Sequence, residues 1–275
     1  MMKKVFLTVS LALATVCLFA QTFQSDNSDR KLGTVSKSGQ PILPKAGDFA
    51  IGINTAPFLN YAGNLLSGGT NTAPTFTYNG GLFGAPSVYA KYFLTDLTAL
   101  RLKLNLGFTS DKTKTQVPEV GNPENLLYNS ETASSSALGL TFGYEIRRGY
   151  GRLQGFFGPE VGVGVESGKT SYEYANSISS SNPVGSRTLS ITDTPFSFVA
   201  GLGGFAGVEY FVAPKLSVGG ELGLRLNFRT IGKTKSESEG WDGSKNVITE
   251  TEVENGSAFN IRAAHVAALN VTFHF

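Results

Sequence analysis

The segment "ALRLKLNLGFTS", Ala99 to Ser110, alternates apolar and polar residues along its whole length. Leucine or phenylalanine occupies every second position, and Arg101, Lys103 and small polar residues lie between them. A period of two predicts a β-strand with one apolar and one polar face. In a soluble sheet the leucines would line the core. In an outer-membrane barrel they would contact lipid, and Arg101 and Lys103 would face the lumen.

Seven further segments show the same alternation, and the connections between them differ sharply in length. The segments are 47–55, 84–93, 136–146, 152–167, 195–211, 215–229 and 258–275. Short turns are predicted at 94–97, 147–152 and 212–215, and loops of about 25–30 residues near positions 70, 122, 180 and 242. This arrangement predicts a single all-β, eight-stranded antiparallel transmembrane β-barrel of up-and-down meander topology, with both termini periplasmic. Ten strands are the alternative, if one long loop re-enters the membrane.

The polar face of these segments carries charges of both signs, separated by many glycines. An exposed strand face would lose stability from so much glycine, whereas a narrow lumen needs small residues beside large charged ones. We therefore expect a lumen charge cluster whose members neutralise one another. Its predicted members are Arg101, Lys103, Glu145, Glu160, Glu209, Glu221 and Arg225.

Aromatic residues on the apolar parity concentrate near the two ends of the predicted strands. Two aromatic rings around an aliphatic band are typical of a transmembrane barrel. The periplasmic girdle is predicted from Tyr92, Tyr144, Tyr210 and Phe273, and the outer girdle from Phe108, Phe196, Phe228 and Phe259. His265, on the lipid parity, is expected at the outer interface, and His274 at the periplasmic one.

The N-terminus predicts export. Lys3 and Lys4 precede an apolar stretch of secretory type, so we expect a signal peptide at 1–20, a flexible polar periplasmic leader at 21–46 and the barrel at 47–275. Lipidation at Cys17 is the alternative, which Val16 disfavours. Cleavage would remove the only cysteine and leave 21 basic against 21 acidic residues. Neither thiolate metal binding nor electrostatic binding of nucleic acid is then expected.

One long loop is itself predicted to form a hairpin. Asp242–Gly243 is a signal for a two-residue type I′ turn. That register sets Lys235 opposite Glu250 and Lys233 opposite Glu252. The last two barrel strands would then continue beyond the membrane as a water-exposed hairpin, and residues 169–192 could extend the preceding pair of strands in the same way.

The chain resembles the small outer-membrane β-barrel proteins of the OmpA transmembrane-domain and OmpX type. "ALNVTFHF" is similar to the C-terminal signal read by the barrel assembly machinery, through Val271, Phe273 and the terminal Phe275. "GDFAIGINTAPFLNYAGN" resembles a first-strand segment of that broad family. The resemblance implies outer-membrane lipid and, during biogenesis, the assembly machinery as partners, and localisation in the Gram-negative outer membrane. It implies no activity.

Other motifs give weak signals. "GLGGFAG" (201–207) lies within a predicted strand, whereas a dinucleotide site needs a strand–turn–helix. No metal-ligand spacing is present, and no cofactor is expected. "NTAPFLNYAGNLL" breaks the alternation and predicts a short loop helix capped by Thr55. Some barrels of this size modify lipid A with a Ser–His pair near the outer rim, but His265 lies on the lipid parity.

The sequence therefore predicts a non-enzymatic outer-membrane barrel whose long extracellular loops interact with a surface ligand or partner, or serve a structural role. A small porin-like channel is the main alternative. A lipid-A-modifying enzyme is the less favoured one.

Overall fold

The computed structural model describes residues 35–36, 39–55 and 88–275, and for residues 260–269 only the backbone. The predicted signal peptide, most of the leader, the long loop near position 70 and its predicted helix lie outside the described residues. So does the side chain of His265. In the part of the chain that is described, no helix is both long enough and apolar enough to cross a membrane.

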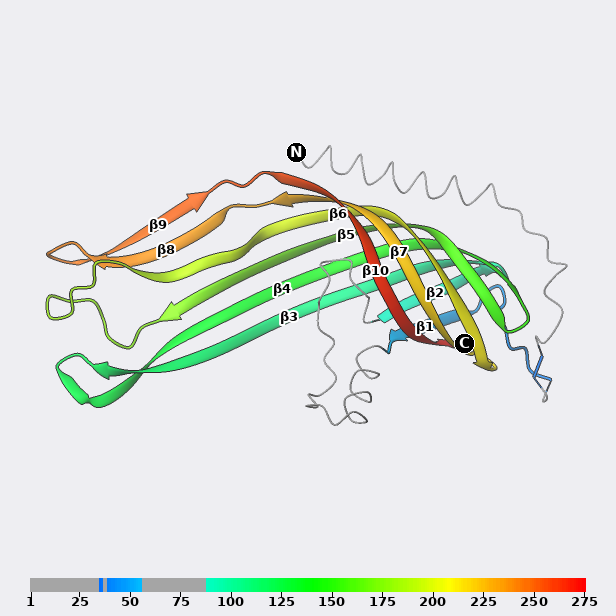
Figure 1. Cartoon of the computed structure of the whole chain (residues 1–275), viewed down its shortest axis with the longest axis horizontal. Coiled ribbons are helices and arrows are strands. Elements are labelled where there is room, and N and C mark those ends of the chain that lie inside the picture. Colours follow the sequence, from blue (N-terminus) through cyan, green and yellow to red (C-terminus); the bar gives the residue numbers. More distant parts are fainter. Residues whose placement is uncertain (1–34, 37–38, 56–87) are drawn as a thin grey trace.

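The described residues form one antiparallel sheet of ten strands (Figure 1). The strands are β1 (Phe49–Asn54), β2 (Val88–Thr95), β3 (Thr98–Glu119), β4 (Asn122–Tyr150), β5 (Leu153–Glu173), β6 (Arg187–Ala213), β7 (Leu216–Ile231), β8 (Thr234–Trp241), β9 (Asn246–Val253) and β10 (Ser257–His274). The all-β antiparallel fold predicted from the alternation is confirmed.

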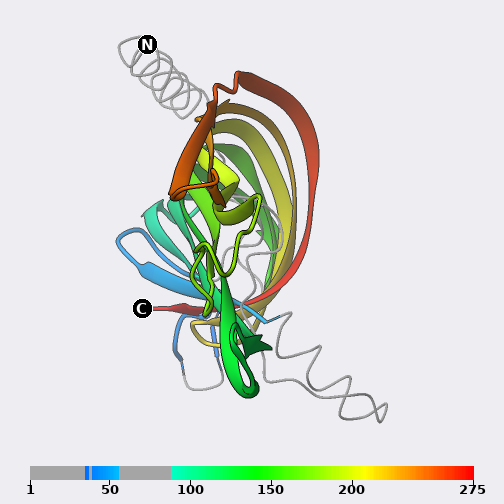
Figure 2. The same cartoon turned by 90° about the vertical axis from the view of Figure 1, so that its left-hand side faces the viewer.

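Eight of these strands close into a ring. The pairing runs from β5 through β4, β3, β2, β1, β10 and β7 to β6, and β6 pairs with β5 again. Figure 2 views the molecule from its hairpin end and shows the strands bending around a common axis. β8 and β9 lie outside the ring, as a hairpin that continues the sheet from β6.

The two ends of the ring differ as the sequence predicts. Three short turns lie at one end, where Thr95 pairs with Thr98, Tyr150 with Leu153 and Ala213 with Leu216. Long hairpins project from the other end, to the left in Figure 1. The chain can reverse tightly after β4 because Gly151 has a φ of 57°, the left-handed conformation that glycine adopts without steric cost.

Two of the expected long loops are largely strand, and near position 180 the extension of β5 and β6 predicted from residues 169–192 is confirmed. The loop predicted near position 122 is a hairpin, because β3 and β4 stay paired as far as Glu119 and Asn122. Gly121, at φ 91°, permits its two-residue turn. The connection near 180 shrinks to residues 174–186, because β5 and β6 stay paired up to Ser171 and Ser190. Alternating Thr, Ser and Lys residues support these extensions, since threonine favours strands even in water.

The β8–β9 hairpin forms, but in a different register from the predicted one. Trp241 pairs with Asn246, so four residues form the loop instead of two. Asp242 closes this loop by accepting hydrogen bonds from the backbone nitrogens of Ser244 and Lys245, both at 2.8 Å. The shift of two residues sets Lys235 opposite Glu252 instead of Glu250. An Asx-type turn at Asp242 thus replaces the predicted type I′ turn.

The ring carries its apolar side chains outward and its charged side chains inward. On β3, Leu102 is 39% exposed, whereas its neighbours Arg101 and Lys103 are 3% and 5% exposed. The same alternation holds on β4 for exposed Leu138 and Phe142. A soluble protein has the opposite arrangement, with apolar side chains buried and ionised ones in water.

Candidate functional site

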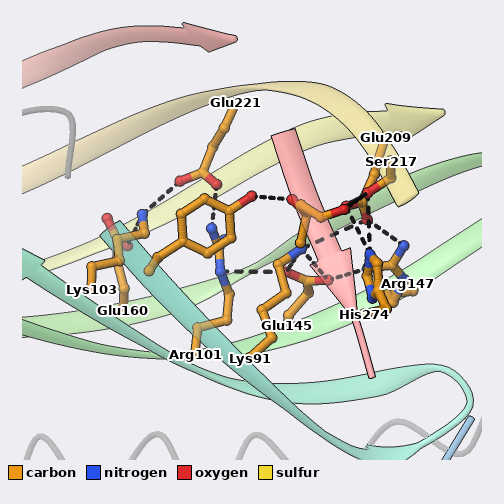
Figure 3. Close-up of polar contacts among 12 residues, drawn as sticks. Lys91, Arg101, Lys103, Glu145, Arg147, Glu160, Glu209, Ser217, Glu221 and His274 are labelled. Atoms are coloured by element: carbon orange, nitrogen blue, oxygen red, sulfur yellow. Dashed lines mark hydrogen bonds and ion pairs between the residues drawn. The ribbon is translucent and has the colours of Figure 1, made fainter. Parts of the chain in front are cut away.

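Ionisable side chains fill the axis of the ring and form one connected network (Figure 3). Five cations and four carboxylates take part, each buried to at least nine-tenths. They are Lys91, Arg101, Lys103, Arg147, Arg225, Glu145, Glu160, Glu209 and Glu221. Six of the eight ring strands contribute, β2 through β7. All seven residues of the predicted lumen cluster lie in this network.

The half of the network nearer the hairpins is organised around Lys103. Its Nζ lies 2.9 Å from Glu160 Oε2 and 2.6 Å from Glu221 Oε1, so one ammonium bridges β5 and β7. Arg225 binds the other oxygen of Glu160 through its Nη2 and through its Nε, the latter at 2.6 Å. Arg101 donates from Nη2 to Glu221 Oε2. Each carboxylate is therefore held by two cations, which compensates for its loss of hydration.

The half nearer the short turns is organised around Glu145 and Glu209. Arg147 spans them, with Nη1 at 2.7 Å from Glu145 Oε1 and Nη2 at 2.5 Å from Glu209 Oε2. Lys91 also contacts both carboxylates, at 3.1 and 3.7 Å. Arg101 Nε lies 3.4 Å from Glu145 Oε2 and so connects the two halves. The ion pairs form one chain along the axis.

Inward aromatic rings separate the charges. The Arg101 guanidinium lies 4.1 Å from the centroid of Phe205, and Lys91 Nζ lies 4.8 Å from that of Phe156. Such cation–π contacts strengthen when they are removed from water. The rings also fill volume that would otherwise hold water beside the ions, so the axis is packed by ion pairs and aromatic faces together.

Glycine provides the space for these large groups. A side chain at Gly203 would collide with the backbone of Leu224 and the side chain of Arg225. At Gly52, on β1, a Cβ would overlap the ring of Tyr89, which reaches over Gly52 so that its hydroxyl hydrogen-bonds Thr272 on the other neighbouring strand, β10. These close approaches give a structural reason for the glycines that alternate with charges in the sequence.

The short-turn end of the ring is covered by residues 41–48, which we call the strap. Ile42 and Leu43 are buried and pack with Phe211 in one apolar cluster. The backbone nitrogen of Ala46 donates to Asp96 Oδ1 at 2.9 Å, which fixes the strap to the β2–β3 turn. The last residues of the segment predicted as a flexible leader are therefore packed against the ring, because "PILP" supplies apolar side chains that cover its end.

His274 was expected at the periplasmic interface and is instead buried inside the ring. Its ring lies 5.1 Å from that of Phe211, and its Nε2 lies 3.1 Å from Ser217 Oγ and 3.6 Å from Glu209 Oε1. The parity of β10 explains this position, because His274 falls between outward Phe273 and Phe275. The prediction overlooked that the alternation continues to the strand end.

Ser217, His274 and Glu209 do not form a catalytic triad. A triad carboxylate orients the histidine nitrogen opposite the serine, whereas Glu209 contacts the same nitrogen, Nε2, that faces Ser217. His274 Nδ1 is buried without a hydrogen-bond partner among the described residues. Ser217 is fully buried, so no substrate reaches its hydroxyl. The trio fits a packing role beneath the strap.

Most of the predicted girdle residues lie on the outside of the ring. Exposed positions near the short turns are Tyr92, Tyr210 and Phe273, and near the hairpins Phe108, Phe196, Phe228 and Phe259. Tyr144 differs from the prediction: it is only 7% exposed, and it lines a groove on the outer surface of the ring.

Of the residues predicted as the assembly signal, Val271 and Phe273 lie at the end of β10 and Phe275 follows it directly. Phe273 and Phe275 are exposed, Val271 is half-buried, and Thr272 between them points inward. Phe275 and Phe49 exchange backbone hydrogen bonds, with Phe275 N donating at 2.7 Å to Phe49 O. The last strand is thereby joined to the first, which closes the ring.

The hairpins beyond the ring are joined to one another. Arg187 on β6 forms an ion pair with Glu239 on β8 at 2.6 Å, and its guanidinium lies 4.2 Å from the centroid of Tyr174. Trp241 N donates to Val184 O at 2.8 Å. Loop 174–186 and the β8–β9 hairpin therefore form one folded layer, which we call the outer layer.

No group of three or more His, Cys, Asp or Glu side chains within the described ranges is arranged to hold a metal ion.

Two solved structures of outer-membrane proteins resemble this chain. A major outer membrane protein from Thermus thermophilus is 14% identical, with a TM-score of 0.35 over 84% of this chain and 100% of that one. The outer membrane protein OprG from Pseudomonas aeruginosa is 13% identical, with a TM-score of 0.27 over 85% of this chain and 98% of that one. No family model and no curated protein matches the sequence. Sequence identities and TM-scores this low assign neither a family nor an activity to this chain.

Sequence reasoning missed Lys91 and Arg147 as members of the network. Arg147 was assigned to the turn 147–152, although it shares the parity of Glu145 and Gly143 on β4. Lys91 shares the inward parity of Tyr89 on β2. Extending the alternation of β4 to its end would have found Arg147, and including the polar parity of segment 84–93 in the lumen cluster would have found Lys91.

Proposed function

We propose that this chain is an integral outer-membrane β-barrel protein, non-enzymatic, with a plugged lumen and with the outer layer outside the cell as a surface for contacting a ligand or partner. The proposal is carried by the inverted arrangement of the ring, with aliphatic side chains exposed on the outside wherever side chains are described and ion pairs buried on the axis. That arrangement suits hydrocarbon outside and a desolvated interior. In water, the same outer surface would drive aggregation.

The short turns belong in the periplasm in this proposal, and the hairpins outside the cell. Short periplasmic turns and longer extracellular loops are the rule for such barrels. Where β1 pairs with both β10 and β2, from Ala50 to Ile53, the ring also leaves no free strand edge, as the absence of water in a bilayer requires. Outer-membrane lipid and the barrel assembly machinery are the partners that this placement implies.

A plugged lumen distinguishes the proposal from a channel. Eight strands enclose a space just wide enough for side chains, and here ion pairs and aromatic rings occupy it. We therefore expect the purified protein to give no stable conductance steps in a planar bilayer. Reproducible ion-selective conductance steps would contradict the plugged lumen and favour the channel alternative.

The location and the non-enzymatic role are tested separately. Expressed in a Gram-negative host, the protein should fractionate with outer membranes, and external protease should cut it at the outer layer but not at the short turns. Recovery in the periplasmic soluble fraction would contradict the proposal. Mass spectrometry of lipid A should show the same acyl pattern with and without the protein, and a changed pattern would favour the enzyme.

A further inference from the structure

The outer surface of the ring is hollowed where β5 and β6 carry small residues. Pro159 pairs with Gly204, and Gly204 with Leu224. In the adjacent outward row, β6 carries Ala206 between Phe157 on β5 and Leu222 on β7. Two successive outward positions of β6 therefore lack a large side chain while their neighbours keep one.

A groove of about 840 Å³ lies at this hollow, which is within the usual size range of small-molecule sites. Tyr144 and Ile146 on β4 border it on one side, and leucines of β7 on the other. None of its lining residues is ionisable apart from Tyr144. Its outward-facing lining includes Phe157, Leu202, Gly204, Ala206, Leu222 and Leu224.

The protein itself leaves this groove open. A Cβ built on Gly204 would meet only the carbonyl oxygen of Gly158, at 3.4 Å. A Cβ built on Gly203 or Gly207, also on β6, would collide with backbone and side-chain atoms. Close packing therefore accounts for Gly203 and Gly207 but does not require glycine at Gly204.

We propose that this groove holds one acyl chain of a membrane lipid, an inference that rests on the membrane-spanning arrangement proposed above. The groove is continuous with the exposed aliphatic band, since Leu202, Leu222 and Leu224 belong to both. Its apolar, uncharged lining matches a methylene chain and offers no charge to a polar ligand.

The physical gain of such a site is packing. Within a bilayer there is no hydrophobic driving force, because lipid is as apolar as the leucines. A concave wall left unfilled forfeits dispersion contacts on the side of the void. A chain lying against Gly204 and Ala206 restores these contacts, whereas the flat surface of a second ring would bridge the hollow. Acyl chains at this groove should therefore stay longer than those at convex parts of the ring.

The test is photolabelling in phosphatidylcholine vesicles that contain a phosphatidylcholine with a diazirine in the middle of one acyl chain. Labelled residues are located by peptide mass spectrometry. We expect groove residues such as Phe157 and Leu224 to be labelled several-fold above Leu102 and Ile51, which are exposed outward residues of β3 and β1. Ala206→Leu should abolish this excess. Ala90→Leu, the same change outward on β2, should leave it intact.

The outcomes separate this inference from the membrane proposal. Vesicle flotation reports insertion, so a protein that does not float refutes both. A floating protein labelled evenly around its ring refutes only the groove, as does equal loss of excess labelling in the two leucine variants. If Ala206→Leu fails to fold, Gly204→Ala is the milder variant, and the wild-type labelling pattern still decides. If the wild-type protein forms dimers in nanodiscs and Ala206→Leu dissociates them, the groove binds a second copy of the chain instead of a lipid.

Discussion

At the residue scale, the ring depends on charges that are expensive to bury unless every one is paired. Glu221 forms ion pairs with Arg101 and Lys103. Removing this one carboxylate therefore leaves two cations without their counter-ion on β7. The loss of one partner from a buried pair is far more costly than replacing both partners by apolar groups.

Glu221→Gln should therefore lower the free energy of unfolding by about 3–5 kcal/mol. The double variant Arg101→Met, Glu221→Met should lower the free energy of unfolding by less than the sum of the losses caused by Arg101→Met and Glu221→Met alone, because the double variant leaves fewer unpaired charges. Urea unfolding in vesicles, followed by the gel mobility of the folded ring, measures both. Glu252→Gln on the exposed hairpin is the matched control and should change little. If Glu221→Gln lowered the free energy of unfolding no more than Glu252→Gln does, the stabilising role assigned to the buried network would be contradicted.

Residue positions were predictable where alternation and charge agree. Arg101 and Lys103 lie inside, where the alternation puts them, because a shift of one position would turn every side chain of β3 to the other face. Tyr144 was not predictable, since its place in the alternation is the same as that of exposed Phe142 on the same face of β4. His274 and Arg147 were missed because we assigned strand ends as turns or interfaces.

At the scale of elements, the β8–β9 hairpin shows how a local turn sets a register. The sequence signal at Asp242–Gly243 was real, but the Asp242 carboxylate binds two backbone nitrogens and closes a longer loop. The predicted ion pairs survive as diagonal contacts, with Lys235 Nζ at 3.2 Å from Glu250. Periodicity alone could not distinguish registers that differ by two, because both keep the same faces.

The hairpin's ion pairs should make its order depend on pH. A hydrogen bond with Lys235 lowers the pKa of Glu252, and a hydrogen bond with Glu252 raises the pKa of Lys235. The stabilisation from Glu252 is thus complete above the ordinary glutamate pKa of about 4.3 and is lost as pH falls below it. That from Lys235 is complete below about pH 10.4 and is lost at higher pH.

Cross-strand NMR contacts between β8 and β9 measure this dependence. They should be strongest at neutral pH and weaken at both extremes, and high salt should weaken them too. Lys235→Gln should flatten the change on the alkaline side. Contacts that stay constant down to a pH of about 2 would contradict the role assigned to Glu252.

The strap makes a second prediction at this scale. Ile42 is fully buried against Phe211, so Ile42→Asp places an unpaired carboxylate in an apolar cluster and should release residues 41–48. Limited proteolysis should then cut within the strap, while the gel mobility of the folded ring stays unchanged. Lys45→Asp, an exposed strap residue, is the control and should not increase cleavage. Unchanged cleavage of the Ile42 variant would show that the strap is not held by this contact.

At the scale of the whole molecule, fold class and topology were predictable because eight alternating segments and the sorted turn lengths agree. Every short turn lies at one end of the ring and the described hairpins at the other (Figure 1). The outer layer was only partly predictable, because its contacts, such as Arg187 with Glu239, join segments that no local pattern relates. Long-range side-chain pairing decided what the alternation left open.

The most direct test of the central claim places tryptophan on each face of the ring. Phe142 on β4 points outward and Phe205 on β6 inward, and they register with β5 at Val161 and Gly158, three positions apart. Phe142→Trp and Phe205→Trp are made in a Trp241→Phe background, which removes the only native tryptophan. Vesicles of lipid brominated in the acyl chain should strongly quench the fluorescence of Trp at 142 and leave that at 205 bright. Quenching at 205 with none at 142 would contradict the account.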